Sequence, residues 1–367
     1  MQRAIPYMQL RGGSSKGVYF KASDLPHEEQ LRNRVVLAAM EGVGLGDPRQ
    51  IDGLGGADPL TSKVAIVSPS QRADADLDYL FLQVVIGGGR VDTVQNCGNI
   101  LAGVLPFAIE SGMWPASEGA TTATIHMVNS GGLCAVTVQT PNRKVNYAGD
   151  AKVDGAPGSA APVICNYLDV VGSATGALLP TGNVIDMVDG LEMTVVDNGM
   201  PVVVLRASDL GRTGYESKAA LDADEELKAR LEQIRLAIGP RMKLGDVSKK
   251  TVPKMCLIAP PIYGGFVHTR TFIPHVCHAA IGVLGAVSTA TACMLPGSVA
   301  EGIAQLPAAG SSLLSIEHPS GEFTIDLDVV VDGDSVVCER SGVLRTARLI
   351  SKGEVYIPAG IWGSLAT

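Results

Sequence analysis

An internal repeat is the feature of this sequence that most restricts its fold. Residues 20–25, Phe-Lys-Ala-Ser-Asp-Leu, return as Leu-Arg-Ala-Ser-Asp-Leu at residues 205–210. Two further echoes follow in the same order: residues 62–69 resemble 253–260, and residues 96–105 resemble 276–284. The offsets between the copies are 185, 191 and 180 residues. Because both order and spacing are kept, we expect a duplication of one structural plan.

Each half of the chain reads as strand, helix, two strands, a buried helix and then alternating hairpin strands. The hairpin strands of the first half are residues 123–128 and 133–140, joined by a glycine turn at 129–132. Those of the second half are residues 323–331 and 335–339, joined by Asp-Gly-Asp at 332–334. The pattern predicts an α+β fold with domains at 1–178 and 179–345. Residues 346–367 are expected to form a last hairpin, and its return to the first domain stays open.

Composition narrows the class of protein. A chain of 367 residues that is 46% hydrophobic and 18% charged can bury large cores, which excludes disorder. A net charge of −8 argues against nucleic acid but allows a small anion to bind where cations converge. Seven cysteines without paired spacing, and no leader before the first strand, predict a cytoplasmic protein with free thiols. The uncharged run 279–295 is shorter than the roughly 20 residues a bilayer requires, so we expect a helix buried in protein.

The motif Asn-Cys-Gly-Asn at residues 96–99 carries the strongest chemical signal. It opens the first predicted buried helix, where unpaired amides and the positive end of the helix dipole stabilise a thiolate. Cys97 can then carry a proton, while the same amides hold a carboxylate or a developing enolate. The alternative is an inert buried cysteine.

Two further segments of the first half point to chemistry on an anion. Lys63 enters a buried aliphatic strand, where a desolvated ammonium is readily tuned into a proton carrier; the alternative is a solvated lysine at a strand end. The segment Arg-Gly-Gly-Ser-Ser-Lys-Gly at 11–17 offers hydroxyls, amides and cations for a carboxylate, or is a plain glycine turn. It does not match a Walker A loop, and the glycines at 53–56 lack the GxGxxG spacing, so no nucleotide cofactor is predicted.

The second half offers His268-Thr-Arg270 and Pro-His-Val-Cys-His at 274–278, which we place at the start of the second buried helix. No partner CxxC or HExxH spacing accompanies them, so no metal is predicted. No hydrolase-type signature surrounds Cys97 either. These second-half side chains are expected to contact the substrate.

With these motifs the chain resembles the 2-methylaconitate and 4-oxalomesaconate isomerases, which share the diaminopimelate-epimerase fold. The resemblance covers essentially the whole chain, and its carriers are residues 11–17, residues 52–56 leading to 61–63, and residues 96–99. Residues 197–201 running into 206–214, and residues 274–282, are most similar to the oxalomesaconate branch.

The resemblance implies two pseudo-symmetric domains, each a curled, mainly antiparallel sheet around a central helix, with substrate in the cleft between them. It also implies proton transfer without a cofactor or metal, with Lys63 and Cys97 as the acid/base pair and their order open. The epimerase relatives use one cysteine from each domain, whereas the second half here has His275, Cys277 and His278. Racemisation by two facing thiols is therefore not expected.

The function expected from this resemblance is a 1,3-allylic proton shift in an unsaturated keto-tricarboxylate, such as 4-oxalomesaconate in protocatechuate or gallate catabolism. The alternatives are 2-methylaconitate cis-trans isomerisation in propionate catabolism and a non-catalytic carboxylate-binding protein. The expected partner is a small anionic tricarboxylate, with no nucleic acid and no membrane, and a homodimer stays open. The predicted substrate ligands are Ser14, Ser15, Lys16, Ser62, Gly98, Asn99, Arg270, His275, Cys277 and His278.

Overall fold

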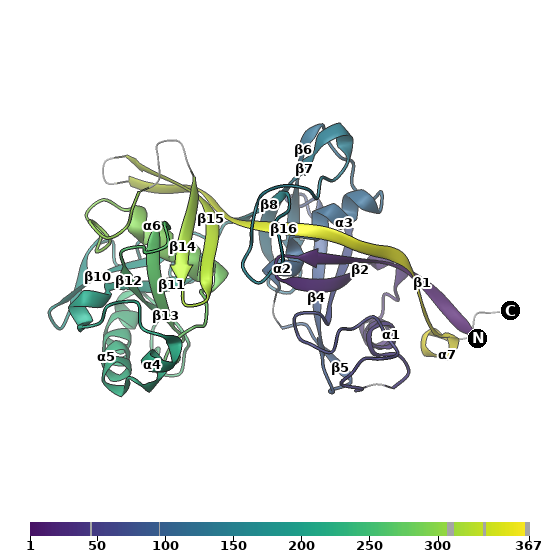
Figure 1. Cartoon of the computed structure of the whole chain (residues 1–367), viewed down its shortest axis with the longest axis horizontal. Helices are drawn as coiled ribbons and strands as arrows, with labels where there is room; N and C mark the ends of the chain where they lie inside the picture. The colour runs from purple at the N-terminus through teal and green to yellow at the C-terminus, as the bar shows by residue number, and fades with distance from the viewer. Residues whose placement is uncertain (45, 95, 307–311, 333–334, 364–367) are drawn as a thin grey trace. The chain divides into compact units, whose positions relative to one another are not determined.

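The structure is a computed structural model that describes residues 1–367 except 45, 95, 307–311, 333–334 and 364–367. The chain divides into two compact units (Figure 1). Unit 1 combines Met1–Leu168 with Leu344–Thr367, and unit 2 is Asp169–Val343. The chain therefore leaves unit 1 once, builds unit 2 and returns.

Unit 1 contains most of the first half of the sequence. Its strands are β1 (Gln2–Gly12), β2 (Ser15–Lys21), β3 (Lys63–Pro69), β4 (Leu77–Val85), β5 (Arg90–Asp92), β6 (Gly119–Met127), β7 (Gly132–Thr140) and β8 (Pro162–Leu168). Its helices are η1 (Ala22–Asp24), α1 (Glu29–Glu41), α2 (Gly98–Leu101), α3 (Val104–Glu110), η2 (Pro141–Arg143) and α7 (Ala359–Trp362).

Unit 2 repeats this list of elements with longer helices. Its strands are β9 (Asp186–Val188), β10 (Leu191–Asp197), β11 (Pro201–Arg206), β12 (Lys254–Ala259), β13 (Val267–Phe272), β14 (Leu313–His318), β15 (Gly321–Asp332) and the first part of β16 (Ser335–Pro358). Its helices are η3 (Ala207–Leu210), α4 (Lys218–Ala223), α5 (Glu225–Arg241) and α6 (Val283–Met294).

Both units follow the same order of strand pairings. In unit 1, β1–β2 is antiparallel, β2–β3 parallel, β3–β4 antiparallel, β4–β6 parallel, and β6–β7 and β7–β8 antiparallel. In unit 2, β10–β11 is antiparallel, β11–β12 parallel, β12–β13 antiparallel, β13–β14 parallel, and β14–β15 and β15–β16 antiparallel. The predicted duplication and the α+β class are confirmed. Of the predicted turn at 332–334, residues 333 and 334 lie outside the described residues.

In each unit, helices pack on both faces of the sheet. This is possible because successive side chains of a strand point to opposite faces. In unit 1, Val18 and Phe20 of β2 pack with Val36 of α1, whereas Tyr19 faces the other way and donates to the Ile100 carbonyl of α2 at 2.7 Å. In unit 2 the corresponding outer helix, α5, packs Leu231 and its neighbours on β10, β11 and β12. Helix α6 contacts β10, β11 and β15 and is the buried inner helix of unit 2.

Helix α6 accounts for the long uncharged run of the sequence. Ser288, Thr289 and Thr291 are almost completely buried in it. The hydroxyl of Ser288 donates to the Met200 carbonyl at 2.7 Å, and that of Thr291 to the Val287 carbonyl at 2.8 Å, so two of these polar groups are satisfied inside the unit. None of the described helices is both long enough and apolar enough to cross a bilayer.

The unit boundary lies at Leu168 rather than near residue 178, because the residues between these positions pair within unit 2. The Gly172 amide donates to the Asp197 carbonyl at 2.7 Å, and the Asp197 amide donates to Leu178 at 2.9 Å. The expected terminal hairpin is also wrong. Strand β16 continues without a turn and runs along β1, from Ala347 opposite Gly12 to Pro358 opposite Gln2, which returns the C-terminus to unit 1.

The first predicted buried helix is broken into α2 and α3. Pro106 has no amide hydrogen with which to continue the hydrogen-bond ladder. The Tyr19 hydroxyl also binds the Ile100 carbonyl and lies so close to Gly103 that a Cβ there would be 2.2 Å from it. A tyrosine from β2 thus replaces part of the helical bonding at the break.

Candidate active site

A pocket of about 110 Å³ in unit 1 brings together the two residues predicted to transfer protons. Strand register builds it, since Lys63 opens β3 opposite Gln83 of β4, and Gln83 in turn lies opposite Asp92 of β5. The segment before α2 adds Asn96 and Cys97, and Phe81 completes the lining. The expectation that Lys63 and Cys97 share one pocket is confirmed, and their catalytic role stays a prediction.

The Lys63 side chain is buried and held by two groups of β4. Its Nζ donates to Gln83 Oε1 at 2.8 Å and lies 5.3 Å from the centre of the Phe81 ring, within the range of a cation–π contact. Within the described part of the chain, no carboxylate forms an ion pair with Nζ. The partners of the lysine ammonium in the described structure are therefore a neutral acceptor and an aromatic face, in the buried setting that the sequence predicted.

Cys97 immediately precedes α2, and its backbone is held from two sides. The Cys97 carbonyl accepts from the Leu101 amide at 2.9 Å and from the Tyr79 hydroxyl at 3.2 Å. Burial raises the pKa of Tyr79, and the Cys97 thiol raises it further, so the hydroxyl stays protonated and remains a donor. The following helix has only four residues, which weakens the dipole argument made from the sequence because that argument assumed an unbroken helix.

Three predicted ligands meet at the β1–β2 turn. Asn99 Nδ2 donates to Ser14 Oγ at 3.0 Å and to Ser15 Oγ at 3.4 Å. Gly12 and Gly13 permit this contact, because a Cβ on either would lie about 2 Å from Asn99 oxygen atoms. Strand alternation places Lys16 on the opposite face of β2 from Ser15.

The remaining predicted residues of unit 1 have structural contacts. Ser62 is completely buried, and its hydroxyl donates to Gln50 Oε1 at 2.6 Å. This hydrogen bond stabilises the loop before β3. Gly98 leaves room for Tyr167, whose hydroxyl would be 2.7 Å from a Cβ at that position. Arg11, part of the same glycine motif, donates to Gly13 and Thr346 and lines a different pocket of about 490 Å³ with Arg348.

In unit 2, Arg270 is held by a buried network on β13. Its Nη1 donates to His268 Nε2 at 2.6 Å, and its Nε donates to the Glu216 carbonyl at 2.7 Å. His268 Nδ1 in turn lies 2.7 Å from Glu317 Oε2. Because arginine only donates, Nε2 must accept, and the Nδ1 proton faces Glu317. Burial and the Arg270 charge lower the pKa of His268, in agreement with this neutral form.

The histidines and cysteine of residues 274–278 do not begin a helix, contrary to the sequence expectation. Helix α6 starts at Val283, and Cys277 instead forms a β-bridge with Phe272 of β13. Between these two residues the chain reverses direction, and the Ile273 amide donates to the Val276 carbonyl at 2.9 Å, so the segment forms a turn instead of a helix start.

These three side chains are not equivalent. Burial raises the pKa of Cys277 to about 11, so it is a thiol at neutral pH. Burial lowers the pKa of His278, whereas the exposed His275 lies 3.9 Å from Glu232. The guanidinium charge of Arg270 lowers the pKa of Cys277 and so opposes part of the rise that burial causes.

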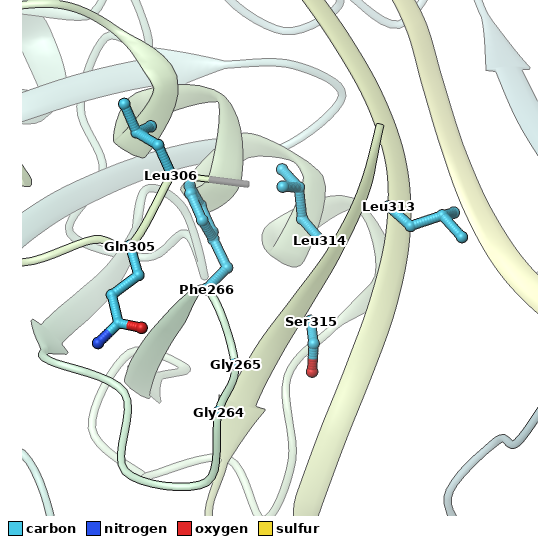
Figure 2. Close-up of a pocket in the computed structure, with 8 residues that line it drawn as sticks. All are labelled: Gly264, Gly265, Phe266, Gln305, Leu306, Leu313, Leu314 and Ser315. Atoms are coloured by element: carbon cyan, nitrogen blue, oxygen red, sulfur yellow. The ribbon is translucent and has the colours of Figure 1, made fainter. Parts of the chain in front are cut away.

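Unit 2 contains a pocket of about 250 Å³ that is lined by none of the predicted site residues. Figure 2 shows it between the Gly264–Gly265 turn with Phe266, the Gln305–Leu306 segment and the Leu313, Leu314 and Ser315 positions of β14. None of these eight side chains is ionisable, so the pocket offers no group for acid–base chemistry. Among the described residues, no three His, Cys, Asp or Glu side chains converge as metal ligands would.

Sequence reasoning predicted Lys63 and Cys97 but none of the other residues that line the unit 1 pocket, Phe81 and Asp92 among them. Gln83 and Asn96 line the pocket with Lys63, and Arg345 is buried on β16 near Tyr167 and Cys97. Burial lowers the pKa of Arg345, and the neighbouring Tyr167, Cys165 and Cys97 oppose that shift. Asn96 adjoins the recognised cysteine and could have been proposed from the motif. Gln83 and Arg345 carry no local signal, because strand register alone places them.

Comparison of the sequence with known proteins identifies the protein family to which it is similar. A family model described as PrpF protein matches residues 2–358. A 4-oxalomesaconate tautomerase of Pseudomonas putida is 55% identical over 99% of this chain and 98% of its own length. A (4E)-oxalomesaconate Delta-isomerase of Novosphingobium is 54% identical over 96% and 98%, respectively. A 2-methyl-aconitate isomerase of Cupriavidus necator is 32% identical over 97% and 98%.

The fold has a solved counterpart. A crystal structure of methylitaconate-delta-isomerase superposes with a TM-score of 0.87 at 34% identity, and it covers 100% of this chain and 98% of that protein. The match extends over both units and supports the α+β architecture described above.

Proposed function

The chain belongs to the PrpF protein family, and from this premise we propose that it is a 4-oxalomesaconate tautomerase, an isomerase that shifts a proton along an unsaturated keto-tricarboxylate. The observation that carries the proposal is the convergence of Lys63 and Cys97 on one pocket of unit 1. Identity of 54–55% to two oxalomesaconate isomerases, over nearly the whole of each chain, favours this substrate.

The reaction needs only proton carriers and a stabilised anion. One residue of the pair removes a proton from the carbon next to the conjugated system, and the electron pair left behind delocalises into a dienolate. The other residue returns a proton two carbons away, so the double bond moves and the atoms balance without an oxidant. Lys63 and Cys97 take these two steps, in either order. Positioned proton transfer of this kind contributes about 10² to 10⁴ in rate.

The carboxylates of the substrate require donors. In unit 1, Asn99 with Ser14 and Ser15 forms a polar cluster beside the β1–β2 turn, and we propose it as one carboxylate ligand. Arg270 of unit 2 stays a prediction as a cationic carboxylate ligand; its Nη1 and Nε are held by hydrogen bonds within unit 2. Lys16, Gly98, His275, Cys277 and His278 stay predictions as substrate contacts.

The test follows the exchange of protons with solvent. Incubation of 4-oxalomesaconate with the protein in deuterium oxide should give a shifted double bond and one deuterium at the new C–H position, read by proton NMR. Lys63→Met and Cys97→Ser should each lower the rate by about 10² or more. Lys144→Met, at an exposed position, and Cys338→Ser in unit 2 are the matched controls and should retain activity.

Three outcomes would contradict the proposal. Undiminished exchange in both Lys63→Met and Cys97→Ser would remove their catalytic role. Faster turnover of 2-methylaconitate than of 4-oxalomesaconate would select the alternative substrate, whose named relative is only 32% identical. Binding of tricarboxylate without any exchange would indicate a non-catalytic carrier.

We also propose a cytoplasmic location, supported by seven free thiols, four of which are completely buried. Fractionation of the native host should place the protein with cytoplasmic markers. Recovery in an oxidising compartment would refute it.

A further inference from the structure

We propose that Gln83 is a positioning residue that holds Lys63 in both of its protonation states during turnover; this inference rests on the proposed function of Lys63. The two side chains lie opposite each other on β3 and β4, and Lys63 Nζ donates to Gln83 Oε1 at 2.8 Å. Both side chains line the pocket that contains Cys97. Nothing in the sequence around position 83 indicates this role.

The amide of Gln83 cannot turn round. Its Nε2 donates to the carbonyl oxygens of Pro59 at 3.2 Å, Ser62 at 3.1 Å and Val84 at 3.2 Å. A flipped amide would place Oε1 against these acceptors and leave its own NH₂ facing the lysine, with repulsion on both sides. The backbone carbonyls of the loop before β3 and of Val84 in β4 thus fix Oε1 as an acceptor aimed at Lys63 Nζ.

A neutral acceptor suits a lysine that changes charge. Both the ammonium and the neutral amine carry N–H groups, so either form can donate to Oε1 and stay in place. When the Lys63 amine is neutral, one of its N–H groups still donates to Gln83 Oε1. This restricts the directions in which the lone pair of Nζ can point to accept a proton. A carboxylate at the same position would favour the ammonium strongly and hinder its deprotonation.

The other groups around Lys63 do not replace this contact. Phe81 gives only an aromatic face to Nζ. Asp92 also lines the pocket, and its Oδ1 accepts from the Val94 amide at 2.8 Å. The titratable side chains that strand alternation places on the same face as Lys63 are Tyr19 of β2, Tyr79 of β4, and Arg90 and Asp92 of β5; Asp58 precedes β3 and Cys97 precedes α2.

Two substitutions of Gln83 test the role, because they should move the pH at which Lys63 titrates in opposite directions. Gln83→Met keeps the length but removes the acceptor, so kcat should fall roughly 10- to 100-fold with KM nearly unchanged, because Nζ is no longer held. The limb of the pH–rate profile that reports the titration of Lys63 should move to lower pH in Gln83→Met, since the ammonium has lost its acceptor. Gln83→Glu should move the same limb up by about one to two pH units, because a carboxylate favours the ammonium. Gln71→Glu, in the exposed turn of the same hairpin, is the matched control and should leave the profile unchanged.

The results separate this proposal from the proposed function. If Lys63→Met retains full exchange, the function assigned to Lys63 fails, and the role of Gln83 fails with it. If Lys63→Met abolishes exchange while both Gln83 variants keep the wild-type kcat and pH profile, only the positioning role is overturned. Should one Gln83 variant fail to fold in thermal melts, an NMR titration of the Lys63 side chain in the other variant measures the shift expected for that variant, downward for Gln83→Met or upward for Gln83→Glu. The absence of that shift would overturn the proposal.

Discussion

Replacing Gly13 by alanine should disturb the candidate active site by a route that the structure specifies. Gly13 has a φ of +51° in the β1–β2 turn, a conformation that costs other L-residues about 1 kcal/mol. A Cβ there would lie 2.2 Å from Asn99 Oδ1 and 2.8 Å from Asn99 Cγ. The Asn99 side chain must therefore turn away and lose its hydrogen bonds to Ser14 and Ser15.

The magnitudes can be separated by a double-mutant cycle. Gly13→Ala should cost about 2 kcal/mol, about 1 from the positive φ and about 1 from the lost hydrogen bonding of Asn99. Asn99→Ala alone should cost about 1 kcal/mol, because it loses the same hydrogen bonds. In the double variant the clashing atoms are absent and the hydrogen bonds are lost once, so the cost stays near 2 kcal/mol. The expected coupling is therefore about 1 kcal/mol.

Urea unfolding followed by circular dichroism measures these costs, and deuterium exchange measures the effect on the site. Gly131→Ala is the matched control, because Gly131 has a φ of +77° in the β6–β7 turn with no atom near its missing Cβ. It should cost about 1 kcal/mol and leave exchange unchanged. Additivity of the Gly13→Ala and Asn99→Ala costs to within about 0.4 kcal/mol would refute the reasoning.

Four further predictions follow. Tyr79→Phe removes the donor to the Cys97 carbonyl, which keeps its Leu101 bond, so we expect a loss of about 1 kcal/mol in urea unfolding and a lower kcat; unchanged values in both would contradict it. The folded pKa of His268 lies below its ordinary 6.5, so the unfolded chain takes up a proton first as pH falls through that value; the melting temperature of the wild type should drop between pH 7.5 and 5.5, and the drop should be smaller in His268→Gln. Incubation with EDTA should leave exchange unchanged, because proton transfer is assigned to side chains; a loss that added zinc restores would contradict that assignment. Lys254→Met, at the position that corresponds to Lys63, should reduce kcat far less than Lys63→Met in the same exchange assay, and an equal loss would contradict the assignment of the chemistry to unit 1.

The sequence predicted those parts of the molecule that local pattern determines. The echoes at residues 20–25 and 205–210 both fall where a strand ends in a short 3-10 helix, η1 and η3, so the repeat marked equivalent corners of the two units. Lys63 and Cys97 were recognisable because each stands at the start of an aliphatic element. The break between α2 and α3 was not predictable, since it depends on Tyr19 of a distant strand reaching the Ile100 carbonyl. The contact of Gln83 with Lys63 could not be predicted either, because only the register of β3 and β4 places the two residues opposite each other.

The two copies of the plan explain why the same residue type can have different chemistry in each unit. Lys63 and Lys254 each open the third strand of the repeated order, β3 in β1–β2–β3 and β12 in β10–β11–β12. In unit 1, β4 extends far enough to place Gln83 opposite the lysine, and the amide holds Nζ. In unit 2, β13 ends at Phe272, which pairs with Met255, so the ladder stops one residue short of Lys254. Burial and the charge of Arg235 lower the pKa of Lys254, yet no hydrogen bond to its Nζ is found among the described residues. Both lysines are therefore at least partly buried, whereas an oriented acceptor for the lysine is found in unit 1, and that difference is the physical reason for proposing Lys63 and not Lys254 as the proton carrier.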